Sequence, residues 1–135
     1  MLLKLKTGEV PGYNEGQEPL VYLVSNAQAV AEADLGFVFT DGHAYAAFSS
    51  WFDNLKMLAQ VDWIAVASRY WGAQNDPSGE LQRRKQAEFL VHGFLDWALI
   101  HEVAVIDNAH KEQVEEVLEE YGSETSVAVR REWYY

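Results

Sequence analysis

The segment RRKQAEFLVHGF, residues 83–94, places the strongest constraint on the fold. Its side chains alternate between a face of Ala87, Phe89 and Val91 and a face of Gln86, Glu88, Leu90 and His92. A period of two predicts a half-buried strand with one face against the core. The opposite face carries a carboxamide and a carboxylate two residues apart, directly after three basic residues. Such a face is most often the solvated side of an antiparallel sheet, so alternation alone assigns it no function.

Length and composition favour one globular domain over residues 1–135, large enough to bury about two-thirds of its unfolded surface. The chain has no cysteine, which excludes disulfides and thiolate metal sites and favours an intracellular protein. Apolar runs fall far short of the roughly 20 residues that span a bilayer, and the opening MLLKLKTGEV is too short for a signal peptide. We therefore expect a soluble cytoplasmic protein that does not associate with membranes.

The net charge of −11 argues against nucleic-acid binding through a broad basic surface. Residues 68–92 nevertheless hold four basic and three acidic groups, whereas the rest of the chain is acidic. This segment contains the consecutive cations Arg83, Arg84 and Lys85, where a polyanion would meet the protein. The alternative interpretation is a solvated basic triplet that closes a loop.

The coarse pattern predicts a mixture of strands and helices. Strands are expected over 19–24, 36–40, 83–94, 102–107 and 126–135, and helices over 26–33, 49–59 and 109–121, with a short helix starting at Asp62. Ser25 or Asn26 can cap the first helix, and Asp107 or Asn108 the last. The longest irregular loop is 70–82. Strands separated by short helices predict an α+β fold with mixed, mostly antiparallel sheets.

Common catalytic motifs are absent: the sequence has no phosphate-binding G-x-G-x-x-G or G-x-x-x-x-G-K-[ST] and no G-x-S-x-G. The histidines, at 43, 92, 101 and 110, include no i, i+4 pair, so we expect no metal site. Among the acidic residues, Glu88 stands out because it falls within a predicted strand beside Leu90. Partial burial there would leave its carboxylate in need of a partner, such as a ligand hydroxyl.

Six blocks of sequence, taken together, resemble one known family. They are VPGYNEGQEPLVYLVSNAQAV, GFVFTDGHA, VDWIAVASRYW, RRKQAEFLV, WALIHEVAV and the terminal RREWYY. In this order they resemble the DarT family, the toxins of DarT–DarG toxin–antitoxin systems. The resemblance runs from the first residues to the last. It implies an ADP-ribosyltransferase-like fold, NAD as ADP-ribose donor, thymidine bases of single-stranded DNA as acceptor, and a DarG-type macrodomain antitoxin as partner.

The resemblance also implies roles for particular residues. Gln86-Ala87-Glu88 is similar to the Q/E-x-E element of ADP-ribosyltransferases, so Glu88 is expected to be catalytic, accepting a hydrogen bond from the nicotinamide ribose, and Gln86 to orient the acceptor base. A carboxylate at that position would stabilise positive charge on the ribose, or take a proton from thymine. His43 aligns with a T-D-x-H block and is expected to face the site; the alternative is a surface histidine after a turn.

The loop before Glu88 is expected to recognise the target in this family. Tyr70 and Trp71 would stack on bases, and Arg83, Arg84 and Lys85 would bind phosphates, since local cations can hold a single strand on an acidic protein. The alternative for the two aromatic residues is that they end a helix and pack on the core.

The sequence departs from the family pattern at its start. A Y-H-x-T-type strand that grips NAD, and an arginine that helps to hold it, are not found, and Met1-Leu2-Leu3 resembles an internal segment of the family. We therefore expect an N-terminally truncated ADP-ribosyltransferase-like domain. Two functions remain open: the catalytic C-terminal part of the transferase, or a catalytically inactive fragment that acts only as a DNA- or antitoxin-interaction module.

Overall fold

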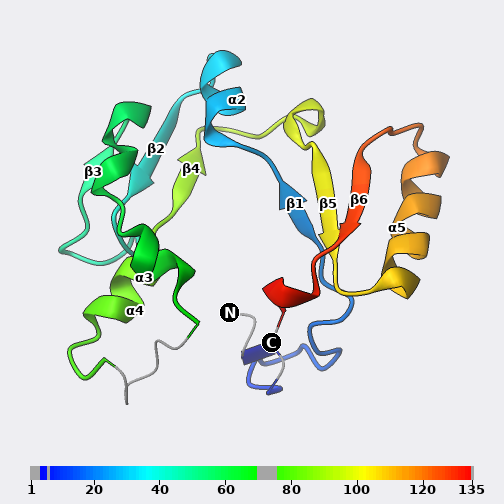
Figure 1. Cartoon of the computed structure of the whole chain (residues 1–135), viewed down its shortest axis with the longest axis horizontal. Coiled ribbons are helices and arrows are strands. Elements are labelled where there is room, and N and C mark those ends of the chain that lie inside the picture. The colour runs from blue at the N-terminus through cyan, green and yellow to red at the C-terminus, as the bar shows by residue number, and fades with distance from the viewer. Residues whose placement is uncertain (1–3, 6, 70–75, 135) are drawn as a thin grey trace. The chain divides into compact units, whose positions relative to one another are not determined.

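The computed structural model describes residues 4–5, 7–69 and 76–134 and divides into two compact units (Figure 1). One unit combines Met1–Ser25 with Asp96–Tyr135, and the other is Asn26–Leu95. We describe each by itself. The expectation of one domain over residues 1–135 stays a prediction.

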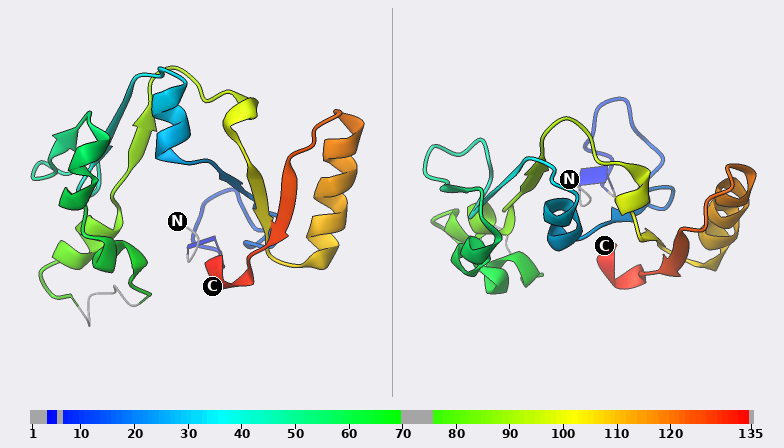
Figure 2. Two further views of the ribbon diagram at one scale, coloured as in Figure 1. Left: turned by 45° about the horizontal axis from the view of Figure 1, so that its top comes forward. Right: turned by 90° about the horizontal axis from the view of Figure 1, so that it is seen from above.

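The first unit contains a three-stranded sheet in the order β1-β5-β6. Its elements are β1 (Tyr22–Val24), η2 (Trp97–Leu99), β5 (Glu102–Val105), α5 (Asn108–Glu120), β6 (Ser126–Val129) and η3 (Arg131–Trp133). Strand β5 pairs antiparallel with β1 and parallel with β6. Parallel neighbours need a crossover connection, and α5 supplies it, lying beside β6 in both views of Figure 2.

Helix α5 closes the core of this unit. Leu118 packs with Val103, Val105 and Val127, and Val114 packs against the edge of the cluster. Asp107 caps the amino end of the helix by accepting from the His110 amide. The helix that the sequence predicts over 109–121 is therefore confirmed, with Asp107 as its cap.

The prediction of a carboxyl-terminal strand over 126–135 is wrong over residues 130–134. Its partner β5 ends at Val105, whose carbonyl accepts from the Arg130 amide at 2.8 Å, and the strand has nothing further to pair with. The chain turns through η3, and Tyr134 is only 4% exposed.

The second unit contains an antiparallel sheet in the order β3-β2-β4. Its elements are α2 (Ala27–Glu32), β2 (Phe37–Thr40), β3 (Trp51–Phe52), η1 (Leu55–Gln60), α3 (Trp63–Ala67), α4 (Glu80–Lys85) and β4 (Phe89–Val91). Aromatic rings pack on one side of the sheet: Phe39, which is 2% exposed, is stacked on Phe89 and lies tilted against Phe52. The strand predicted over 36–40 and the helices predicted over 26–33 and from Asp62 are confirmed.

The strand predicted over 83–94 is wrong at both ends. Arg83, Arg84 and Lys85 form the last turn of α4, Gln86 is its C-cap, and only Phe89–Val91 is strand. The helix is stabilised by ion pairs from Glu80 to Arg83 and Arg84, one turn apart. Because β2 is four residues long, the ladder can pair only a short segment of the chain after Gln86.

The helix predicted over 49–59 is wrong over its first half, and Leu55–Gln60 form the 3₁₀ helix η1. Trp51 and Phe52 pair with Thr40 and Phe39 of β2, and this long-range pairing overrides the helical spacing of the apolar residues. Asn54 then caps the 3₁₀ helix η1 through its side chain. Within the described part of the chain, no helix is long and apolar enough to cross a membrane.

Candidate active site around Glu88

The backbone of Glu88 is hydrogen-bonded to Thr40 at the end of β2. The Thr40 amide donates to the Glu88 carbonyl at 2.9 Å, and the Glu88 amide donates to the Thr40 hydroxyl oxygen at 3.1 Å. That hydroxyl in turn donates to the Gly42 carbonyl at 2.6 Å, and Thr40 is completely buried. The main chain at Glu88 is therefore fixed independently of its side chain.

The Glu88 carboxylate receives two donors from the turn after β2. His43 Nδ1 lies 2.9 Å from Oε1, and the Ala44 amide donates to the same oxygen at 3.1 Å. Because an ionised carboxylate only accepts, this contact is a hydrogen bond in the tautomer that carries its proton on Nδ1 of His43. The side chains of His43 and Glu88 remain 49% and 36% exposed. The carboxylate is thus oriented by the protein and still accessible to a ligand.

The turn that carries these donors is closed by its own hydrogen bonds. Asp41 Oδ1 accepts from the Ser50 amide at 2.9 Å, and the Ser49 hydroxyl donates to the His43 carbonyl at 2.8 Å. The Asp41-Gly42 pair, which the sequence marks as a turn, sits at its start. We call residues 41–50 the Asp41–Ser50 loop.

Arg83 joins α4 to this loop. Its Nη1 donates to Asp41 Oδ1 and to Ser49 Oγ, each at 3.3 Å, while Nε and Nη2 donate to Glu80. The hydrogen bonds that the guanidinium donates to Glu80, and then those to Asp41, raise its pKa above the usual value. The side chain is 16% exposed, so it is largely enclosed by protein groups.

The two following cations also have protein partners. Arg84 pairs with Asp62 at 3.3 Å and with Glu80 at 3.4 Å but stays 47% exposed. The Lys85 ammonium donates to the Val66 carbonyl at 2.8 Å. The pKa of Asp62 is lowered, first by the Ala65 amide and then by Arg84. Phosphate binding by the triplet stays a prediction, and Arg84 is its most exposed member.

Of the remaining predicted site residues, Gln86 is described by the structure, whereas Tyr70 and Trp71 are not. Gln86 lies outside β4 as the C-cap of α4, and its side-chain amide donates to the Gln82 carbonyl at 3.2 Å, so strand alternation does not put it beside Glu88. Tyr70 and Trp71 lie outside the described residues.

Sequence reasoning missed Thr40, Ala44, Asp41 and Ser49. The T-D-G-H block pointed to His43 alone. The Ala44 contribution is a backbone amide, which no side-chain pattern can reveal, and the Ser49 role depends on the loop closing on itself.

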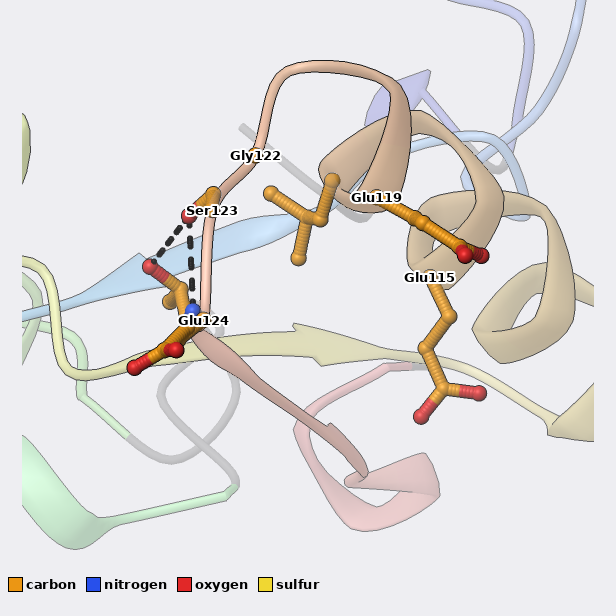
Figure 3. A pocket seen from close by; sticks show the side chains of 7 residues that line it. Glu115, Glu119, Gly122, Ser123 and Glu124 are labelled. Atoms are coloured by element: carbon orange, nitrogen blue, oxygen red, sulfur yellow. Dashed lines mark hydrogen bonds between the residues drawn. The ribbon is translucent and has the colours of Figure 1, made fainter.

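A pocket in the first unit lies at the carboxyl end of α5 (Figure 3). It is lined by Glu115, Glu119 and Glu124, with Ser123 and Thr125 bonded to each other beside them. Three carboxylates repel phosphate groups, so this pocket is a poor site for a nucleotide or for DNA. Among the described residues, no group of three or more His, Cys, Asp or Glu side chains could hold a metal ion.

The chain is similar to known DNA ADP-ribosyl transferases. The family model described as "ssDNA thymidine ADP-ribosyltransferase, DarT" matches residues 1–135. A DNA ADP-ribosyl transferase of Thermus sp. (strain 2.9) is 45% identical over 125 residues, which are 91% of this chain and 58% of the relative. One from Escherichia coli O127:H6 is 30% identical over 135 residues, all of this chain and 62% of the relative.

Solved structures agree with this match. The Thermus sp. 2.9 DarT structures in complex with NAD+ and with ADP-ribosylated ssDNA both give a TM-score of 0.92 at 42% identity. Each alignment covers 99% of this chain. The aligned part is 66% of the solved chain in the NAD+ complex and 63% in the complex with ADP-ribosylated ssDNA. The expected α+β fold of ADP-ribosyltransferase type is confirmed. The chain spans a little over half the length of the curated relatives it matches, 53–62%.

Proposed function

This chain belongs to the DarT family of ssDNA thymidine ADP-ribosyltransferases, and on that basis we propose an activity for it. It transfers ADP-ribose from NAD to thymidine bases in single-stranded DNA, with Glu88 as the catalytic glutamate. The observation that carries this proposal is the Glu88 carboxylate, which is accessible yet oriented by His43 and by the Ala44 amide.

The chemistry needs a carboxylate of this kind. The bond between nicotinamide and the ribose breaks, nicotinamide leaves with the bonding electrons, and positive charge develops on the ribose ring. A preorganised carboxylate stabilises that charge as it forms and accepts from the neighbouring 2′-hydroxyl. As the thymine base bonds to the ribose, it loses a proton, which the same carboxylate can take.

Both substrates are supported by relatives at 42% identity. The Thermus sp. 2.9 DarT has been solved with NAD+, with carba-NAD+ and with ADP-ribosylated ssDNA. In this chain, Tyr45 and Phe48 follow His43 and are 95% and 86% exposed, so they offer aromatic faces on which bases can stack. NAD serves as a consumed substrate, and the reaction as written requires no metal.

We extend the proposal to the biological setting through the family. The protein acts as the toxin of a toxin–antitoxin system in the cytoplasm, where NAD and DNA are both available, and a DarG-type macrodomain antitoxin is its partner.

A second function remains a candidate because the chain spans only 53–62% of the length of its curated relatives. In that alternative the chain is catalytically inactive and binds DNA or the antitoxin without transferring ADP-ribose.

The test is transfer to a thymidine-containing oligonucleotide in the presence of NAD, measured as a mass increase of the DNA. We expect modification by the wild-type chain, and Glu88→Gln to slow it by about 10²–10⁴-fold because the charge-stabilising group and general base are lost. Glu116→Gln, an exposed glutamate on α5, is the matched control and should retain the wild-type rate.

The outcomes separate the two candidates. Wild-type chain that binds the oligonucleotide without modifying it would support the inactive module. Modification by Glu88→Gln at the wild-type rate would refute the assignment of Glu88.

A further inference from the structure

The Asp41–Ser50 loop brings both donors to the Glu88 carboxylate, and among the described residues its hydrogen bonds to α4 come from Arg83. Deepening the function proposed above, and resting on it, we propose that Arg83 is a positioning residue. It holds His43 and Ala44 against Glu88 and does not serve as a ligand of DNA phosphate.

The backbone of Arg83 contacts the loop directly. Its carbonyl accepts from the His43 amide at 3.0 Å. Gly42 is buried against the same residue: a Cβ at that position would meet Arg83 Nη1 and lie 3.1 Å from both its Cγ and its carbonyl oxygen. The last turn of α4 and the loop are therefore packed together just before His43.

The guanidinium closes the loop from both ends. Nη1 reaches Asp41 at one end and Ser49 at the other, each at 3.3 Å. Ser49 accepts from Arg83 and donates to the His43 carbonyl at 2.8 Å, so one chain of hydrogen bonds runs from Arg83 through Ser49 to His43. His43 then contacts Glu88 at 2.9 Å.

Nε and Nη2 of Arg83 also have a partner, the carboxylate of Glu80. Nε lies 3.3 Å from both carboxylate oxygens of Glu80, and Nη2 lies 3.2 Å from one of them. A phosphate would have to displace the carboxylates of Glu80 and Asp41 from a side chain that is 16% exposed. Arg84, one residue later, is 47% exposed, and its ion pairs among the described residues are with Asp62 and Glu80, which lie outside the loop.

The Glu88 backbone does not depend on Arg83, because Thr40 holds it from β2. Loss of the guanidinium should therefore loosen the loop at Asp41 and Ser49, while the sheet and the hydrogen bond from the His43 amide to the carbonyl of residue 83 remain. Lysine keeps the charge but has no planar fork to join Asp41, Ser49 and Glu80, so Arg83→Lys should rescue only part of the effect.

The first measurement reports whether the Ala44 amide stays hydrogen-bonded to Glu88, and it does not require enzymatic activity. Nitrogen–proton NMR spectra are recorded over a pH series. The chemical shift of the Ala44 amide should change with the charge of Glu88, because this amide donates to Oε1. Glu88→Gln identifies that response by removing it. We expect Arg83→Gln to weaken this response strongly and Arg83→Lys to weaken it less, while Arg84→Gln keeps it.

The second measurement compares kcat, KM and the salt dependence of transfer among the variants. We expect Arg83→Gln to lower kcat for transfer by about 10- to 100-fold through misplacement of the site, with little change in KM for the oligonucleotide or in its salt dependence. Lys56→Gln, an exposed cation in the same unit, should leave both unchanged. A phosphate ligand would behave in the opposite way, with kcat retained and a smaller salt slope.

The two measurements distinguish failure of this proposal from failure of the proposed function. If no variant and no wild-type protein transfers ADP-ribose, the proposed function fails, and the Ala44 response alone decides whether Arg83 positions the loop. If Arg83→Gln does not fold, Arg83→Lys carries the test with a smaller change of the same sign. An Ala44 response that is unchanged in every folded Arg83 variant would overturn the proposal, as would a reduced salt slope at unchanged kcat.

Discussion

At the scale of single residues, Glu88 is held by two independent sets of bonds. Thr40 fixes its main chain, and His43 together with the Ala44 amide fixes its carboxylate. The two sets come from the end of one strand and the turn that follows it, so a change in the turn can disturb the carboxylate without unfolding the strand pair.

This separation predicts the effect of replacing His43. His43→Ala should lower the transfer rate by about 10- to 100-fold, the equivalent of a hydrogen bond to a charged group, because only the Ala44 amide then orients the carboxylate. The melting temperature should change little, since the His43 side chain is 49% exposed.

The check is single-turnover transfer to a thymidine oligonucleotide alongside thermal unfolding. His92→Ala is the control, an exposed histidine that follows β4 in the same unit. If His43→Ala transfers as fast as the wild type, the contact with Glu88 has no catalytic role.

At the scale of elements, the carboxyl-terminal segment is held to the first sheet by Tyr134. Its hydroxyl donates to the Leu20 carbonyl at 2.7 Å and to the Ala104 carbonyl at 3.2 Å. Burial, with a smaller contribution from Tyr22, raises the pKa of Tyr134 to about 12. The fold therefore favours the neutral phenol over the phenolate.

This shift predicts the alkaline limit of stability. A tyrosine whose pKa is raised by folding contributes stability in full below its unfolded pKa of about 10, and that contribution is lost as the pH rises through about 12. Tyr134→Phe should cost about 1 kcal/mol near neutral pH and should weaken the alkaline loss. Urea unfolding at neutral and alkaline pH measures both, with Tyr121→Phe, 80% exposed, as the control. A Tyr134→Phe protein that loses stability with pH as steeply as the wild type would contradict this account.

Elements set by local pattern could be predicted from the sequence. Helix α5 is long, periodic and capped by Asp107, and the prediction over 109–121 matches it closely. The segment 80–85, ELQRRK, consists of strong helix formers, and this signal for α4 was outweighed by the alternation that follows it. Strand β3 could not be predicted, because it exists only through pairing with β2.

In the candidate site, too, features set by local sequence could be predicted and features set by long-range pairing could not. Glu88 could be identified from the Q-x-E pattern and the family resemblance. Its contact with His43 joins residues 45 positions apart and depends on the antiparallel pairing of β2 with β4. The loop partners of Arg83 could not be predicted either, because Asp41 and Ser49 reach it only after the loop has closed.

At the scale of the whole molecule, charge is divided unevenly between the two units. The unit that carries Glu88 holds five basic and eight acidic residues, whereas the other holds five and thirteen. Of the basic triplet in α4, Arg83 is enclosed by carboxylates and Lys85 donates to a backbone carbonyl, which leaves Arg84 as the member best able to meet a phosphate. Binding of single-stranded DNA should therefore involve few phosphate contacts and depend only modestly on salt.

This distribution predicts different results for the same charge change in the two units. Arg84→Gln should weaken binding of a thymidine oligonucleotide and reduce the slope of log K against log salt by about 0.7, the value for one phosphate contact on a single strand. Arg131→Gln, in η3 of the other unit, changes the net charge equally and should leave the slope unchanged. Fluorescence titrations of a labelled oligonucleotide at several salt concentrations measure the slopes. Equal effects of the two substitutions would mean that binding follows the total charge of the protein, and the placement of DNA at α4 would then be wrong.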